Sequence, residues 1–195
     1  MACRAAPWRL TPPPRKWQTL GMQTAIACLA PSEIEAALPG LAALLADCVE
    51  GGAAVNFVWP FDAEQALAYW RRQLPGLLAG KAKLFAARDA AGGILGCVML
   101  DADTPPHQPH RAEIKKLLVL RRARRLGLAR ALMLAAEDEA RRLGRTLLIL
   151  DTRDGDNGQK LYEAIGYVLF GRVPGYSLPV HGGEAETCAF YYKQL

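Results

Sequence analysis

The chain has 195 residues, a length suited to one domain with or without a tail. Its 51% apolar and 22% charged residues exclude gross disorder, and no apolar run is long enough to span a bilayer. The net charge is +5, but residues 1–21 contain four basic residues and no acid, so residues 22–195 carry only +1. A body so nearly neutral argues against non-specific binding to nucleic acid.

The predicted elements of residues 22–195 alternate between strand and helix. In chain order they are a strand at 24–29, a helix at 31–50, a helix from 62 to before 80, strands at 83–88, 94–100 and 111–120, a helix at 127–143, a strand at 146–151, a helix at 157–165, and strands at 167–172 and 186–192. We expect Ser32 and Asp62 to cap the first two helices, and a break in the first helix near Pro39. This order predicts a single α/β domain with a mixed sheet.

Residues 1–21 differ from the rest of the chain. They contain three consecutive prolines, and they have neither a hydrophobic period nor the apolar core of a secretory signal. We expect a disordered tail, or an artefact if Met22 is the true start. A transit peptide is the weaker alternative, because the prolines would break its amphipathic helix.

The spacing of the cysteines indicates a reducing compartment, and that of the cysteines and histidines gives no sign of a metal site. Five cysteines are widely spaced without a Cys-x-x-Cys pair, and the three histidines complete no metal-ligand pattern. Scattered thiols in odd number are typical of the cytoplasm rather than of a disulfide framework, and we expect no metal.

The most informative stretch runs from Arg121 to Arg130, between a predicted strand and a predicted helix. Gly127 and Ala129 leave the backbone uncovered at the first helical turn, where unpaired amides and the helix dipole favour an anion. Five arginines flank this turn, so the pattern predicts a diphosphate site. The alternative is a solvated basic face in which Gly127 only eases a turn. The phosphate loop of nucleotide hydrolases and the dinucleotide-binding fingerprint are excluded, because their glycine patterns are absent.

Residues 124–129 (Arg-Arg-Leu-Gly-Leu-Ala) match the Arg/Gln-x-x-Gly-x-Gly/Ala signature of the GCN5-related N-acetyltransferases. Leu150-Asp151-Thr152 and residues 161–167 (Leu-Tyr-Glu-Ala-Ile-Gly-Tyr) follow in the order of that family. The chain from about Met22 to Leu195 therefore resembles this family. The resemblance implies a mixed central sheet of about six to seven strands flanked by about four helices, with splayed fourth and fifth strands.

The same resemblance implies acetyl-CoA as cofactor, with backbone amides of residues 125–130 holding its pyrophosphate. The exposed backbone of residues 118–120 would pair with the pantetheine arm, as an added strand would. The residues expected to bind the cofactor are Leu118, Val119, Leu120, Arg124, Arg125, Leu126, Gly127, Leu128, Ala129, Arg130 and Asn157. One departure is Gly155, where the family often has Asn; Asn157 is nearby but out of register.

The expected reaction is transfer of an acetyl group to a primary amine by direct attack. Because an ammonium has no lone pair, the amine must first lose a proton. Glu113 and Asp151 are the candidate bases, and Tyr162 stands at the family position of the acid that protonates the leaving thiolate. The structural alternatives are a salt bridge of Glu113 with Arg111 or Lys115, a turn cap for Asp151, and ordinary packing for Tyr162.

A narrower resemblance bears on the acceptor. Four segments, residues 51–55, 111–117, 150–152 and 174–176, are similar to the acetyltransferases that confer resistance to tabtoxin, a β-lactam amino-acid toxin. This implies a small zwitterionic acceptor. The residues expected near its pocket are Asn56, Trp59, Phe61 and Tyr176. We favour a shared scaffold with a different natural acceptor over tabtoxin itself, because substrate choice resides in loops.

The sequence is also compatible with other functions. A protein or peptide could be the acceptor, and the domain could bind acyl-CoA without turnover. Because family members often dimerise, a homodimer is expected, whereas neither nucleic acid nor a membrane is expected as a partner.

Overall fold

The fold is built on one mixed sheet with helices on both faces. The computed structural model describes residues 15–19 and 22–195. The strands are β1 (Arg15–Thr19), β2 (Met22–Cys28), β3 (Ala82–Arg88), β4 (Ile94–Asp101), β5 (Arg111–Val119), β6 (Leu147–Arg153), β7 (Val168–Ser177) and β8 (Glu186–Gln194). The helices are α1 (Pro31–Glu50), α2 (Ala63–Leu78), the 3-10 turn η1 (Arg121–Ala123), α3 (Leu128–Arg142) and α4 (Asn157–Ala164).

The sheet has the order β1-β2-β3-β4-β5-β6-β8-β7. All neighbouring strands are antiparallel except β5 and β6, which pair in parallel over three positions that end at Glu113 and Ile149. Counted from β2, these are the fourth and fifth strands, so the expected α/β fold with splayed strands is confirmed. The eighth strand, one more than expected, is β1.

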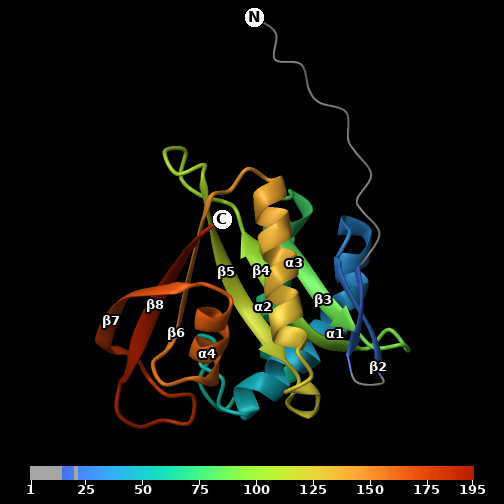
Figure 1. Ribbon diagram of the computed structural model, residues 1–195. Coiled ribbons are helices and arrows are strands. Elements are labelled where there is room, and N and C mark those ends of the chain that lie inside the picture. The colour runs from blue at the N-terminus through green and yellow to red at the C-terminus, as the bar shows by residue number, and fades with distance from the viewer. Residues whose placement is uncertain (1–14, 20–21) are drawn as a thin grey trace, which may run out of the picture.

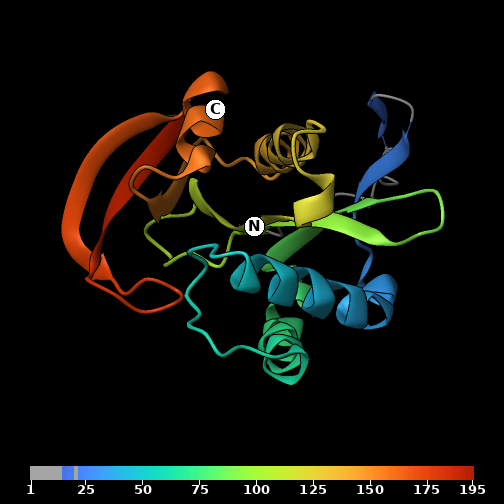
Figure 2. The same ribbon diagram turned by 90° about the horizontal axis from the view of Figure 1, so that it is seen from below.

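The helices form two layers, with α1 and α2 on one face of the sheet and α3 and α4 on the other (Figures 1 and 2). The core beneath α3 includes the buried side chains of Leu132, Met133 and Leu148, and the core beneath α1 includes Leu41 and Trp70. Burial of both apolar faces is the main force that holds the helices on the sheet. Within the described ranges, no helix is long and apolar enough to cross a membrane.

The helix starts follow local hydrogen bonding. Asp62 caps α2 as expected, because its Oδ1 accepts from the amide of Gln65 at 2.8 Å. Ser32 is not the cap of α1. The N-cap is Ala30, whose amide donates to Glu33 Oε2 at 2.8 Å. The expected break at Pro39 is also absent, since α1 runs through it and buries nine side chains along its length.

The N-terminal segment differs in part from the sequence prediction. Arg15–Thr19 form β1, which pairs antiparallel with β2, so disorder is wrong for these five residues. Residues 1–14 and 20–21, on which the rest of that prediction falls, lie outside the described residues. At the other end, β7 continues to Ser177, five residues beyond the predicted strand.

Candidate active site

A cleft of about 780 Å³ opens where β5 and β6 diverge. It is lined by the loop after α1, the free edge of β5, the turn before α3, the end of β6 and the start of α4. These segments meet at the lower end of the sheet in Figure 1. The cleft therefore lies at the carboxyl ends of the only two parallel strands in the described sheet.

The turn before α3 forms an anion site at one end of the cleft. Arg125 and Gly127 have positive φ angles of 65° and 77°, and Gly127 is the N-cap of α3 without a side chain to satisfy the helix amides. The first backbone hydrogen bond of the helix joins Ala131 N to Gly127 O at 3.1 Å, so the preceding amides have no acceptor in the helix. Arg124 and Arg130 also line the cleft. Free amides, helix dipole and guanidinium groups together favour a diphosphate.

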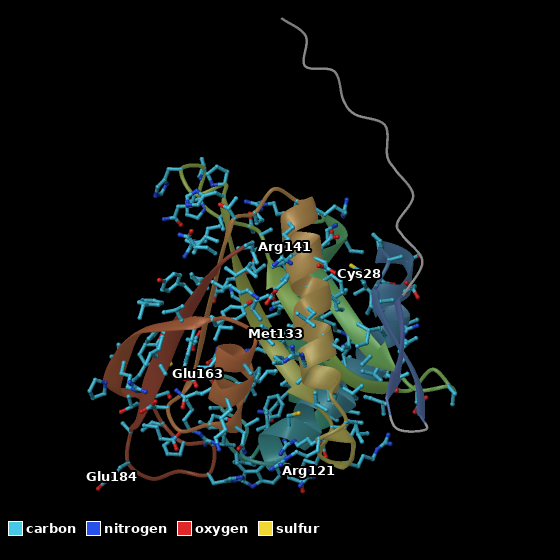
Figure 3. All side chains as sticks on the ribbon, in the orientation of Figure 1. Cys28, Arg121, Met133, Arg141, Glu163 and Glu184 are labelled. Carbon is cyan, nitrogen blue, oxygen red and sulfur yellow. The ribbon has the colours of Figure 1, made fainter. Side chains whose placement is uncertain are left out.

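Arg121 holds this turn in place rather than facing the cleft. Its amide and its Nε donate to the two carboxylate oxygens of Asp47 on α1, at 2.9 and 2.8 Å, and it also pairs with Glu50. Figure 3 shows Arg121 at the lower end of the molecule, beside η1. Burial acts to raise the pKa of Asp47, but the hydrogen bonds from Arg121 lower the pKa overall.

The free edge of β5 supplies the middle of the cleft. Beyond Glu113 the strand has β4 on one side and no strand on the other, and Leu118 and Val119 line the cleft there. Two of the residues expected to bind the cofactor do not line it. The amide of Leu120 donates to Leu95 O at 2.9 Å, and Leu126 packs against the core.

The two candidate bases lie on the same face of the sheet. Glu113 on β5 pairs in register with Ile149 on β6. Asp151 lies two residues after Ile149 and therefore points to the same face of the sheet, and both Asp151 and Glu113 line the cleft. Glu113 Oε2 is 3.3 Å from Lys115 Nζ, which is one of the structural alternatives left open for it. Asp151 is exposed and accepts a hydrogen bond of 3.5 Å from the Cys188 thiol.

Tyr162 reaches the cleft from α4 and is almost fully buried. Burial raises its pKa above the ordinary value, so its hydroxyl stays protonated at neutral pH. Gly158, one turn earlier, makes room for the ring: a Cβ there would lie 3.2 Å from the Tyr162 ring. Asn157 lines the cleft at the helix start. Gly155 has a φ of 80°, a conformation that both Gly and Asn tolerate, so its departure from the family pattern keeps the backbone geometry.

The residues expected near the acceptor separate into two groups. Asn56, with a φ of 70°, lines the cleft. Trp59, Phe61 and Tyr176 are not among the lining residues: Trp59 is half exposed near His181, Phe61 is buried against Phe57, and Tyr176 stands exposed on β7.

Sequence reasoning missed Lys116. It lies at a bulge of β5 with a φ of 52°, lines the cleft, and donates from Nζ to Val55 O at 2.9 Å. Its Nζ is also 5.5 Å from the centre of the Phe57 ring and 5.3 Å from that of Tyr69. Nothing in the sequence separates it from Lys115, because a period of two gives no sign of a bulge.

The fold and the cleft are those of an acyl-group transferase that takes a long, diphosphate-bearing carrier. A sequence model of the Acetyltransferase (GNAT) family matches residues 40–167, more than half of the chain. The chain belongs to this family and is an acetyl-CoA-dependent acetyltransferase.

Solved structures of low sequence identity share the fold. One is a Salmonella typhimurium protein solved with its cofactor acetyl-CoA (17% identity, TM-score 0.67, covering 88% of this chain and 94% of that one). A second is the ribosomal-protein-alanine N-acetyltransferase of Brucella melitensis (20%, TM-score 0.67, 87% and 99%). A third protein, provisionally named a phosphinothricin N-acetyltransferase, has 16% identity and a TM-score of 0.69 (89% and 99%). These names span protein and small-molecule acceptors, so the shared fold leaves the acceptor open.

Proposed function

We propose that this acetyltransferase acts on the primary amine of a small molecule by direct attack, without an acyl-enzyme. The observation that carries this proposal is the convergence of Glu113, Asp151 and Tyr162 on the cleft that also holds the anion site. Acetyl-CoA supplies an activated acetyl thioester. The free amides before Ala131 and the free edge of β5 suit its diphosphate and its amide-bearing arm, so the residues present fit this cofactor.

The side chains then have separate tasks. Glu113 or Asp151 takes the proton of the acceptor ammonium, directly or through water, which frees the nitrogen lone pair for attack. Tyr162, kept protonated by its burial, donates a proton to the departing thiolate. Burial raises the pKa of Cys48, the cysteine that lines the cleft. Burial also raises the pKa of Cys188, to about 11. Both thiols are therefore protonated at neutral pH, which disfavours either as a thiolate nucleophile.

The loop after α1, which lines the cleft, is held from outside the cleft. The loop after α1 is tied to the loop between β7 and β8, since Trp59 N donates to Val180 O at 2.7 Å and His181 Nε2 lies 3.2 Å from Glu50 O. A loop tied in this way opposes the opening that a folded protein segment would need, which favours a small acceptor. An amino acid or a toxin-like molecule, including one related to tabtoxin, is therefore the acceptor class we propose, with a protein or peptide acceptor as the alternative.

We also propose that the protein is a cytoplasmic homodimer. The four cysteines of the described chain are free thiols, as is usual in a reducing compartment. β7 forms one edge of the sheet (Figure 2). Its residues Phe170, Val173 and Tyr176 are 60%, 44% and 53% exposed. An exposed apolar edge strand of this kind suits a second copy of the chain. Light scattering after chromatography tests it, because Phe170→Glu should give a monomer; a wild-type monomer contradicts it.

A free-thiol assay tests the reaction. Acetyl-CoA turnover is measured with amino acids, small amines and short peptides, and calorimetry measures CoA binding for each variant. We expect turnover with small amines, and a fall of about 100-fold or more in Glu113→Gln, Asp151→Asn or both, at unchanged CoA affinity. Turnover with peptides alone would favour the protein acceptor. CoA binding without turnover of any amine would leave an acyl-CoA-binding domain instead.

A further inference from the structure

Lys116 presents a positive charge in the wall of the cleft. On β5 the stretch from Lys115 to Leu118 faces a shorter stretch of β4, and this bulge turns Lys116 toward the loop after α1. The ammonium sits between Val55 O, at 2.9 Å, and the faces of Phe57 and Tyr69. An ammonium has three donors, so the bond to Val55 leaves two for another partner.

This ammonium lacks a counter-ion. Across the part of the chain that the structure describes, no carboxylate oxygen lies within 4.0 Å of Lys116 Nζ. Two of the other partly buried lysines are paired: Lys115 with Asp101 at 2.9 Å, and Lys193 with Glu137 at 2.7 Å. One neutral hydrogen-bond acceptor and two aromatic rings offset only part of the free energy that the half-buried ammonium loses with its hydration.

The cleft carries charges of both signs. Asp151 and Glu113 line it with Lys116, and both act on Lys116 electrostatically from beyond ion-pair distance. Burial lowers the pKa of Lys116, and the two carboxylates oppose that shift while the neighbouring Lys115 adds to it. A ligand with one cationic and one anionic group can satisfy both poles, whereas a simple amine satisfies only the carboxylates.

We propose that Lys116 binds an oxyanion of the acceptor, a carboxylate carried close to its amine, and so selects amino-acid-type zwitterions. This inference rests on the proposed function, because it takes the amine to be the group that is acetylated. Asp151 and Glu113 face the ammonium of the acceptor, and Lys116 faces its carboxylate. The bulge therefore places the residue that selects the acceptor, Lys116, on the same strand whose free edge would bind the cofactor.

The competing role for Lys116 is to hold the loop after α1 through Val55. Both roles make the residue necessary, so loss of activity alone does not separate them. Only the proposed role predicts that the Lys116 ammonium responds to a ligand carboxylate, and that its removal erases the preference for an acid over the matching amide.

The deciding experiment observes the lysine side chains of the CoA-bound protein by NMR. Lysine is labelled at Nζ and Cε, Lys116→Met identifies the signal, and Lys116→Arg serves instead if the Met variant does not fold. The standard amino acids, their carboxamides and acetate are each added to about 50 mM, enough for millimolar affinity. We expect a saturable shift of the Lys116 signal with at least one amino acid and none with its amide. No shift with any carboxylate, or equal shifts with acid and amide, overturns the proposal.

Kinetics give the second readout. With an amino acid that the enzyme acetylates as substrate, Lys116→Met should raise KM about 10- to 100-fold with little change in kcat, because one charge-assisted hydrogen bond is lost. Lys83→Met, which removes a half-buried lysine of β3 outside the cleft, is the matched control and should change neither. An unchanged acid-to-amide ratio in Lys116→Met contradicts the proposal. Turnover separates the two failures: if no small amine is acetylated, the proposed function fails, and if small amines are acetylated while Lys116 does not respond to any carboxylate, only this inference fails.

Discussion

One added methyl group at Gly127 tests the anion site. Gly127 has a φ of 77°, where an alanine costs about 1–2 kcal/mol of folding free energy. For a domain of this size we expect Gly127→Ala to lower Tm by about 2–8 °C. The new Cβ also projects from the turn whose amides face the cleft, so we expect the Kd for CoA, measured by calorimetry, to rise at least about tenfold.

Gly144 provides the matched control at the other end of α3. It has a φ of 71°, and a Cβ there would meet no atom within 4 Å. Gly144→Ala should therefore lower Tm by a similar amount and leave the Kd for CoA unchanged. Wild-type affinity in Gly127→Ala would refute the anion site, and equal loss of affinity in both variants would attribute the effect to general destabilisation.

Three further changes test other parts of the structure. Tyr162→Phe should lower kcat about 100-fold with unchanged CoA affinity, and unchanged turnover in this variant would rule out the acid role. Because burial raises the pKa of Tyr162, deprotonation of its hydroxyl should not lower the wild-type kcat up to about pH 9. Lys193→Met leaves Glu137, 1% exposed, without its closest cation, and should lower the urea unfolding free energy by about 3 kcal/mol; a loss below about 1 kcal/mol would show that the pair contributes little. Asp47→Asn should cost about 1 kcal/mol in the same assay at neutral pH. Since the Asp47 pKa is lowered on folding, this difference should persist above its unfolded value of 3.8 and fade as pH falls through the lower folded value; a pH-independent difference would contradict it.

The fold could be predicted because short-range sequence patterns determine its helices, strands and turns. The apolar run at 147–150 predicts a buried strand, Asp62 predicts a helix start, and the hairpin between β3 and β4 follows from its glycines. The anion site could also be predicted, since Gly127 and the flanking arginines are adjacent in sequence. Local hydrogen bonding and backbone strain act over a few residues, so such features survive in the folded chain.

The rest depends on contacts that sequence spacing does not encode. Pro39 indicates a break, but the nine buried side chains of α1 outweigh the lost backbone hydrogen bond. The aromatic run at 57–61 suggested a substrate pocket, yet Phe61 faces the core and Trp59 is half exposed outside the cleft. Lys116 enters the cleft only because the bulge reverses the alternation that its neighbours follow.

The position of the cleft follows from how β6 divides its pairing between two neighbours. It pairs with β8 along all of Leu147–Arg153 but with β5 only as far as Ile149, so its far end follows β8 away from β5. From Ile114 onward β5 keeps β4 alone, and its other edge presents unpaired backbone groups that water or a ligand must satisfy. The same end of the sheet carries the free amides at the start of α3. A ligand that satisfies both must be an extended chain with amide groups and an anionic end, and CoA has this constitution.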